Sequence, residues 1–322
     1  MVKVCFVTGA GGFVGRALVK ALLAAGNVVR ALDVRFPAEW PAEVQRLQGD
    51  ICDANLLEEG CRGADWLFHL AALLPQRHAS AARMRQVNVE GVRQLLEAAL
   101  RAGVSRAVML SSAEVYGVPR TVPCPEDAQP APLGEYGRNK VAAEQLAGDA
   151  FRRGLQIAIL RPPTVVGPTM TDRVLLGTLA ALRKGMPMVV PAGRGRFQMV
   201  AVSDLVAACM AAVVAREAAG EAFNIGADRL LSQVETFRQL RTRVRSRSLV
   251  VPLPRPVLRG ALRLLSAIGR SPLEPEHVSI ALADYVFDTR KARERLGWQS
   301  AKSNVDALVE TYQWLTGAVP PE

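Results

Sequence analysis

Short apolar runs alternate with helical patterns along the first half of the chain. The runs VCFV (Val4–Val7) and IAIL (Ile157–Leu160) contain no polar residue, which is typical of strands buried between two layers of helices. Because helical patterns separate these runs, successive strands are joined by right-handed crossovers and lie parallel. The alternation therefore predicts an α/β fold, a doubly wound parallel sheet of the Rossmann type.

The predicted elements divide the chain near residue 165. The strands are Val4–Val7, Val28–Val34, Leu47–Gln48, Leu67–Leu70, Val108–Leu110 and Ile157–Leu160, and the helices are Gly15–Ala25, Arg83–Ala102 and Tyr136–Arg153. After Arg161, prolines and glycines interrupt the pattern. We expect a sheet domain over residues 1–165 and a smaller, mostly helical lobe over residues 166–322. Strands near Met199–Val202 and Ala222–Ile225, within about residues 197–226, are expected to return to the sheet.

The chain is basic but lacks the features of a nucleic-acid-binding protein. Its 40 Lys and Arg exceed its 30 Asp and Glu, and only 5% of its residues are aromatic. No basic stretch is interleaved with stacking side chains, so we expect no nucleic-acid partner. The five cysteines form no CxxC pair, which argues against a disulfide framework and a metal site. No apolar stretch is long enough to span a membrane, so we expect a cytoplasmic protein.

A glycine-rich segment, TGAGGFVG, connects the first strand to the first helix. Glycines such as Gly9, Gly12 and Gly15 allow a tight turn, a close approach of the backbone to a pyrophosphate, and close packing of the helix. Asp33 ends the second strand, where a carboxylate reaches the ribose hydroxyls of a dinucleotide and repels a 2′-phosphate. The pattern predicts a site that favours NAD over NADP, although Arg35 leaves room for the phosphorylated cofactor.

Two segments carry candidates for catalysis. Tyr136 and Lys140 stand four residues apart in YGRNK, on one face of a predicted helix. A tyrosine with a pKa near 10 is a poor acid or base at neutral pH, so a neighbouring cation that favours the phenolate suits such chemistry. The segment SSAEVYG (Ser111–Gly117) follows a predicted strand at the sheet edge where a hydroxyl can meet a substrate, and it offers two serines.

These motifs carry a family resemblance. Together with HLAA (His69–Ala72) and GDI (Gly49–Ile51), they resemble the extended short-chain dehydrogenase/reductase superfamily over essentially the whole chain. That superfamily includes NAD-dependent epimerases and dehydratases of nucleotide sugars and a 3β-hydroxysteroid dehydrogenase-like branch. The resemblance implies that Tyr136 is the general acid/base, that Lys140 binds the nicotinamide ribose and lowers the pKa of Tyr136, and that Ser112 hydrogen-bonds the substrate oxygen. It also implies a homodimer.

The resemblance further implies which residues contact the cofactor and the substrate. The implied NAD contacts are Gly9, Gly12, Phe13, Val14, Gly15, Asp33, Asp50, Ile51, Leu70, Ala71, Ala72, Asn88, Tyr136, Lys140 and Pro163. The implied substrate contacts are Ser112, Glu114, Thr164 and Phe197. Asn88 matches a helix asparagine that the family uses structurally and in proton relay. His69 is interpreted as a packed structural residue and not as a base.

Two positions differ from the sugar-nucleotide pattern. Many nucleotide-sugar enzymes carry a diphosphate-binding asparagine where this chain has Thr164, and an arginine where it has Phe197. We therefore expect NAD-dependent hydride transfer at a secondary alcohol or ketone of a fairly apolar small molecule. The alternative is an epimerase or dehydratase of nucleotide sugars with tightly bound NAD, because a bulge could return Arg196 to the missing position. A non-catalytic scaffold is a third hypothesis, against which the complete catalytic set argues.

The segment 254–270, PRPVLRGALRLLSAIGR, predicts a helix with an apolar stripe and several arginines. Such a helix could lie on a membrane surface. It could equally be a lobe helix that covers a substrate pocket. Both interpretations follow from the sequence.

Overall fold

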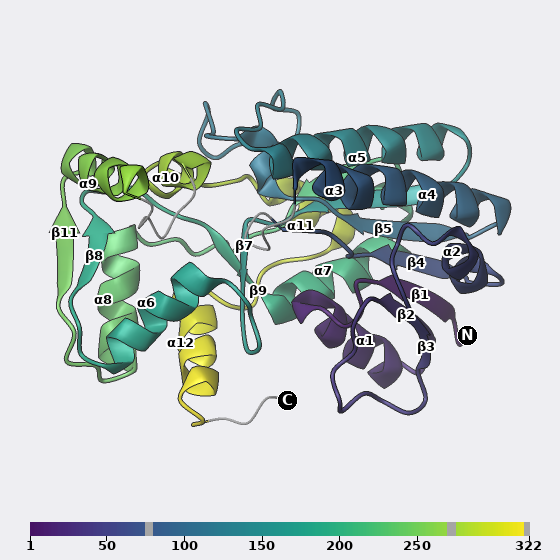
Figure 1. Ribbon diagram of the computed structural model, residues 1–322, viewed down its shortest axis with the longest axis horizontal. Coiled ribbons are helices and arrows are strands. Elements are labelled where there is room, and N and C mark those ends of the chain that lie inside the picture. Colours follow the sequence, from purple (N-terminus) through teal and green to yellow (C-terminus); the bar gives the residue numbers. More distant parts are fainter. Residues whose placement is uncertain (75–79, 269–274, 319–322) are drawn as a thin grey trace.

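A parallel sheet forms the centre of the molecule (Figure 1). The computed structural model describes residues 1–74, 80–268 and 275–318. In the part that is described, the main sheet has seven strands in the order β10-β6-β5-β4-β1-β2-β3, and every pair is parallel. The predicted Rossmann-type sheet is confirmed. Its strands are β1 Val4–Thr8, β2 Val28–Asp33, β3 Gln45–Gln48, β4 Trp66–His69, β5 Arg106–Leu110, β6 Gln156–Arg161 and β10 Ala222–Asn224.

The strand order reverses between β1 and β4. From β1 the chain moves outward to β2 and β3, then returns to add β4, β5 and β6 on the other side. At such a reversal, the loops after the two neighbouring strands diverge and leave a crevice at their carboxyl ends, where ligands bind in this kind of fold. The glycine-rich segment follows β1 and the HLAA segment ends β4, so both lie at this crevice.

Helices cover both faces of the sheet in two layers (Figure 1). One face is packed by α1, α7 and α11, which bury apolar residues such as Leu22, Leu205 and Leu296 in a common core. The other face is packed by α2, α4 and α5, which bury Leu57, Leu95 and others. The bounds are α1 Phe13–Ala24, α2 Ala54–Cys61, α4 Gly91–Arg101, α5 Glu135–Arg152, α7 Val202–Val214 and α11 Arg290–Leu296.

Outside these layers, the elements from β7 onward form a lobe at one end of the sheet, on the left in Figure 1. Its core includes Val166, Leu179 and Leu308, and it contains two short parallel strand pairs. The helices are α6 Arg173–Arg183, α8 Gln233–Arg243, α9 Arg255–Ala267, α10 Pro275–Ala281 and α12 Asn304–Leu315. The strand pairs are β7 Thr164–Val166 with β9 Met199–Ala201, and β8 Met188–Pro191 with β11 Val250–Leu253.

One of the two predicted returning strands is wrong. Residues Met199–Ala201 form β9, which pairs with β7 in a separate sheet, and Val202 begins α7. The reason lies at Pro162 and Pro163, which follow β6 and lack the N–H that would continue the main sheet. The strand at Ala222–Asn224 does join the main sheet, parallel to β6.

Two predicted helices differ in detail. The helix expected over Arg83–Ala102 consists of α3 Ala81–Arg85, a π-helical turn at Gln86–Glu90, and α4. The helix expected over 254–270 is α9, which ends at Ala267, and residues 269 and 270 lie outside the described residues. Within the described ranges, no helix combines the length and the apolar character that crossing a membrane requires. The division into domains at residue 165 stays a prediction.

Candidate active site

The glycine-rich loop is packed too closely to accept side chains. Gly9 has a φ of +71°, and a Cβ there would lie 2.5 Å from the backbone nitrogen of Ala71. A Cβ at Gly15 would lie 2.1 Å from the carbonyl oxygen of Gly9. Gly12 caps α1 without a side-chain hydrogen bond, so the first backbone N–H groups of the helix lack a side-chain acceptor. A helix N-terminus of this kind attracts a phosphate.

Asp33 lies beside this loop at the end of β2, as predicted. The backbone N–H of Gly11 donates to its Oδ2 at 3.0 Å, and the N–H of Arg35 donates to its Oδ1 at 3.1 Å. A Cβ at Gly11 would lie 2.1 Å from the carbonyl oxygen of Arg35. The carboxylate is therefore held at the crevice by the backbone on both sides.

Asp50 follows β3 and is bound by a neighbour that the sequence did not reveal. Its Oδ1 accepts a hydrogen bond from the N–H of Cys52 at 2.9 Å, and its Oδ2 pairs with the Arg83 guanidinium. Burial alone would raise the pKa of Asp50, but the hydrogen bonds of Cys52 and the charge of Arg83 lower it below its usual value. The adjacent Ile51 is 5% exposed and packs against Gly91.

Asn88 fixes the loop that follows β4. Its Oδ1 accepts a hydrogen bond from the N–H of Leu73 at 2.8 Å, and its Nδ2 donates to the carbonyl of Leu73 at 2.9 Å. This pair holds the segment with Leu70, Ala71 and Ala72 close to the glycine-rich loop. The structure thus gives Asn88 the structural role that the resemblance implies, and its part in proton relay stays a prediction.

The other implied cofactor residues stand at the start of α1 and just after β6. Phe13 is the first residue of α1, and its ring packs against the lobe core, 3.5 Å from a Cβ built at Gly167. Val14 packs against the core beneath α1. Pro163 is buried immediately after β6. Each is placed near the first helix or the end of β6, and their contacts with a cofactor stay predictions.

Tyr136 and Lys140 lie in the first two turns of α5 and are both buried. They are 8% and 5% exposed, and the Lys140 Nζ lies 5.7 Å from the centroid of the Tyr136 ring. The ammonium donates a hydrogen bond to the carbonyl of Leu110 at 2.7 Å. The two side chains therefore share one helix face, as the spacing predicts.

Burial dominates the pKa of Tyr136 in the chain without cofactor, and the lowering by Lys140 that the resemblance implies stays a prediction. Burial, followed by the charge of Glu114, raises the pKa of Tyr136 above its usual value. Burial also lowers the pKa of Lys140 to about 8. The ammonium is directed to the Leu110 carbonyl, and an apolar environment favours the neutral form of both groups.

The structure separates the roles of the two adjacent serines. Ser112 Oγ accepts a hydrogen bond from the N–H of Glu114 at 3.2 Å and caps the short 3₁₀-helix Ala113–Tyr116. Ser111 is buried instead, and its Oγ donates to Glu144. Ala113, which follows Ser112, donates its N–H to the carbonyl of Pro162 at 2.9 Å. This hydrogen bond connects the segment to the end of β6. The hydroxyl that stays half-buried at the strand end belongs to Ser112, the residue that the resemblance implies.

A buried polar network lies behind these residues and was missed by the sequence reasoning. Arg161 donates to both carboxylate oxygens of Glu144, at 2.9 and 2.6 Å, and to the hydroxyl of Tyr116 at 2.6 Å. That hydroxyl donates to the Oδ1 of Asn224 on β10 at 2.8 Å. Glu144 stands four residues after Lys140 on the same helix face, and this spacing was the only signal in the sequence. The network joins α5, β6, β10 and the segment Ser111–Tyr116, which we call the catalytic loop.

The implied substrate residues lie where the lobe meets the sheet. Phe197 stacks on Tyr285, with ring centroids 5.4 Å apart, and its carbonyl accepts a hydrogen bond from Asn304. Thr164 opens β7. Glu114 Oε1 lies 3.5 Å from the Nε2 of His277, so α10 contacts the catalytic loop.

Two further polar residues have structural partners. Arg196 forms an ion pair with Asp284 at 3.1 Å, so its guanidinium is already engaged. His69 is buried at 3% exposure, and its Nδ1 lies 2.8 Å from the hydroxyl of Thr8. Burial, with the charge of Lys140, lowers the pKa of His69 to about 3, so the ring is neutral. This agrees with its interpretation as a packed residue.

Comparison with known proteins identifies the family. Residues 5–226 match the model of the NAD dependent epimerase/dehydratase family. The Synechocystis sp. protein named "Putative dihydroflavonol 4-reductase" is 31% identical over 96% of this chain and 93% of its own. The UDP-glucose 4-epimerase of Azospirillum brasilense is 28% identical over 95% and 89%. Among solved structures, MoeE5 in complex with UDP-glucose and NAD has a TM-score of 0.78 and 28% identity, covering 98% and 99% of the two chains.

The family match, the parallel sheet and the glycine-rich crevice agree with one another. The relatives include both a reductase and nucleotide-sugar enzymes. They agree in the family, but they differ in the substrate. The chain belongs to the NAD-dependent epimerase/dehydratase family of the extended short-chain dehydrogenase/reductase superfamily, and it is an NAD-dependent enzyme.

Proposed function

We propose that this enzyme is an oxidoreductase, close to the 3β-hydroxysteroid dehydrogenase-like branch, that acts at a secondary alcohol or ketone of a fairly apolar substrate. One observation carries the proposal. Phe197 stands where nucleotide-sugar enzymes place a diphosphate-binding arginine, and its ring is stacked on Tyr285. The neighbouring Arg196 is held by Asp284, which argues against the bulge that would replace the missing cation.

The crevice residues fit NAD. A Cβ at Gly9 or Gly15 would fill the space between the loop and its neighbours, which supports close approach of the backbone to a pyrophosphate. In our proposal the N-terminus of α1 holds the phosphates, Asp33 accepts hydrogen bonds from the adenosine ribose, and Lys140 binds the nicotinamide ribose. When bound, NAD supplies the acceptor or donor of the hydride.

The proton chemistry is assigned to Tyr136. Its raised pKa keeps the phenol neutral in the chain without cofactor, which suits donation of a proton to a ketone oxygen. In the oxidation direction the phenol oxygen has to accept the proton of the alcohol, and the nearby Lys140 ammonium is the charge that would stabilise a phenolate. Ser112, fixed by the 3₁₀-helix that it caps, is assigned to hydrogen-bond the substrate oxygen.

A nucleotide-sugar epimerase or dehydratase is the second candidate. It is favoured by the relatives themselves, because a UDP-glucose 4-epimerase and the UDP-glucose complex of MoeE5 match nearly the whole chain. The same three side chains would serve this reaction, in which the hydride is returned to the sugar. The two candidates therefore differ in whether reduced cofactor accumulates.

The test is to incubate the purified enzyme and NAD with a panel of apolar secondary alcohols and of UDP-sugars, and to follow NADH and product. We expect net NADH with an apolar alcohol. We also expect Tyr136→Phe to lower turnover by about 10²- to 10⁴-fold with NAD affinity retained. Tyr312→Phe, the same change on α12, is the control and should leave turnover unchanged. Conversion of a UDP-sugar without net NADH would identify an epimerase and exclude our assignment.

A further inference from the structure

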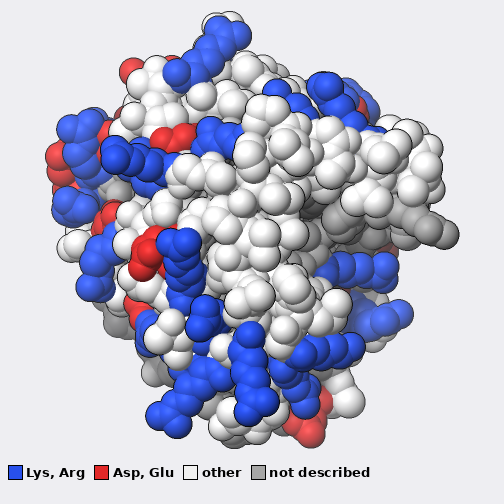
Figure 2. All heavy atoms as spheres, turned by 90° about the vertical axis from the view of Figure 1, so that its left-hand side faces the viewer, with Lys and Arg blue, Asp and Glu red and all other residues white. Residues whose placement is uncertain are grey.

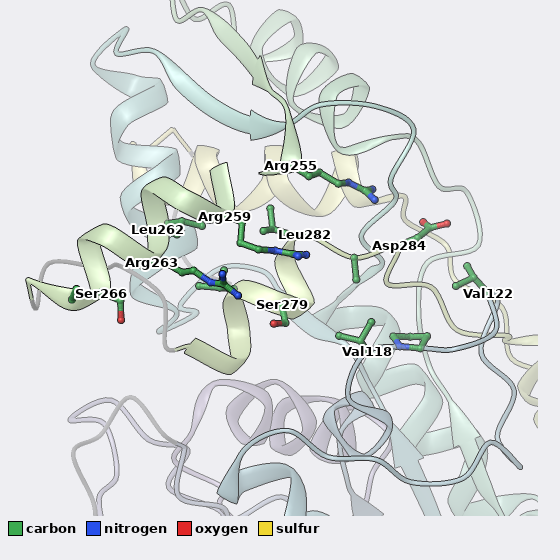
Figure 3. A pocket seen from close by; sticks show the side chains of 14 residues that line it. Val118, Val122, Arg255, Arg259, Leu262, Arg263, Ser266, Ser279, Leu282 and Asp284 are labelled. Atoms are coloured by element: carbon green, nitrogen blue, oxygen red, sulfur yellow. The ribbon is translucent and has the colours of Figure 1, made fainter. Parts of the chain in front are cut away.

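A cavity of about 920 Å³ lies between α9, α10 and the loop that continues from the catalytic loop. Figure 3 shows the side chains of Arg255, Arg259 and Arg263 extending from α9 toward the same side, where Asp284 and Val118 lie. The sequence places these arginines four residues apart, so the helix brings them onto one stripe. The lining includes none of Ser112, Tyr136 and Lys140. The cavity is linked to the segment that carries Ser112 through α10, whose His277 contacts Glu114.

The positive charge of this stripe is only partly balanced by the described lining residues, because Asp284 interacts with Arg255 but no carboxylate pairs with the other two arginines. Asp284 is the sole carboxylate among the described lining residues, and it already binds the backbone N–H and the guanidinium of Arg196. Arg259 and Arg263 are exposed, and neither makes an ion pair with any of the described residues. Like charges four residues apart weaken a helix, so this stripe costs stability unless an anion joins it.

Arg255 adds a second, independent sign of a missing partner. Its Nε is buried and has no hydrogen-bond partner, although buried polar atoms are normally paired. The same side chain lies against Gly195, where a Cβ would be 1.9 Å from its guanidinium. It borders a second hollow of about 510 Å³, to which Arg194 also contributes. The row of arginines therefore continues beyond the N-terminal end of α9, from Arg255 to Arg194.

The rest of the cavity wall indicates the class of ligand. Ser266 and Ser279 supply hydroxyl groups, while Val118, Val122 and Leu282 supply an apolar surface. The described lining residues include no aromatic ring on which a base could stack, and no amide to pair with its edge. Arginines grip phosphate oxygens through paired hydrogen bonds. The wall thus suits a phosphate group on an aliphatic body better than a nucleotide.

We propose that the α9 cavity binds the phosphate or diphosphate group of an aliphatic ester, with the α9 arginines as its ligands. The surface around it is suited to anions, because Lys and Arg outnumber Asp and Glu on this end of the molecule (Figure 2). The site is separate from the dinucleotide crevice. The inference therefore holds whether the enzyme is an oxidoreductase or an epimerase.

The experiment compares two double variants of the full-length protein. Arg259→Gln with Arg263→Gln removes two charges from the cavity wall, and Arg183→Gln with Arg238→Gln removes two exposed charges from α6 and α8. Calorimetry with hexyl phosphate should show saturable binding to the wild type. The affinity should fall on the order of 100-fold in the cavity variant and stay unchanged in the control. Both variants should unfold at or above the wild-type temperature, since like charges are removed.

Further probes separate the sources of the phosphate. 1-Hexanol should not bind, and UDP should bind more weakly than hexyl phosphate. Retention on phosphatidylcholine vesicles that contain phosphatidic acid, lost in the cavity variant, would identify a lipid as the source, and no retention would identify a soluble ester. Tighter binding of UDP, an equal loss of affinity in both double variants, or binding confined to vesicles would each overturn the proposal.

Discussion

Asp33 accepts two backbone hydrogen bonds, from Gly11 and Arg35, and both lie at the mouth of the crevice. Asp33→Asn keeps an acceptor for Gly11 but removes the charge that repels a 2′-phosphate. We expect the preference for NAD over NADP to fall by about tenfold or more, measured by titration of both cofactors. Asp53→Asn, a matched loss of charge at the N-cap of α2, should preserve the preference. Tighter binding of NADP to the wild type would contradict the role of Asp33.

Lys140 gives a pH dependence whose sign can be worked out. Burial lowers its pKa to about 8, from an ordinary value of 10.5. Between these values the folded chain has released the proton while the unfolded chain still holds it, so the free energy of unfolding rises with pH. The gain across the window is roughly 3 kcal/mol. It is measured as the difference between wild type and Lys140→Met in urea unfolding without NAD. A difference that is flat from pH 7.5 to about 10.5 would contradict it.

Single residues were predictable where the chemistry lies within one short motif. Ser112, Tyr136 and Lys140 each follow from a local pattern, and the fold brings their segments together. The ion pair of Arg161 with Glu144 could not be predicted, because its members lie on a strand and a helix whose facing sides depend on packing. The raised pKa of Tyr136 also depends on burial, which no local pattern gives.

At the scale of elements, the junction of β1 and α1 depends on two backbones that nearly touch. A methyl group at Gly15 would meet the carbonyl of Gly9 at 2.1 Å, so Gly15→Ala should displace the loop and weaken NAD binding as well as folding. Gly177, in the middle of α6, has open space at the same position. Gly177→Ala should therefore stabilise the protein by about 0.5–1 kcal/mol. Thermal unfolding and NAD calorimetry of both variants test this, and equal effects would contradict it.

Elements were predictable in proportion to the length of their pattern. The buried strands of the main sheet are continuously apolar, and α5 carries a long amphipathic pattern. Strand β9 is only three residues long. It pairs with β7, which begins after Pro162 and Pro163, and a pattern this short does not indicate which sheet the strand joins. The arginines of α9 were visible, but the cavity that they face requires the placement of α10.

At the scale of the whole molecule, the pair of Glu144 and Arg161 connects the helical layer to the sheet and, through Tyr116, to β10. Both side chains are at most 10% exposed. Glu144→Ala leaves a buried guanidinium without its partner, and we expect a loss of about 3–5 kcal/mol of stability in urea unfolding. The exposed pair of Arg101 with Glu58 is the control, and Glu58→Ala should cost less than about 1 kcal/mol. Similar losses of stability in Glu144→Ala and Glu58→Ala would show that burial does not determine how much the ion pair contributes.

The chain returns to the main sheet with β10 after it has entered the lobe. This return limits how such an enzyme can exchange its lobe during evolution. The chain leaves the sheet after β6, returns with α7 and β10, and returns again with α11 before it ends in α12. A single genetic crossover after residue 161 would carry away the last strand of the sheet and two of its covering helices. Recombination of whole lobes is thereby disfavoured relative to local changes within them.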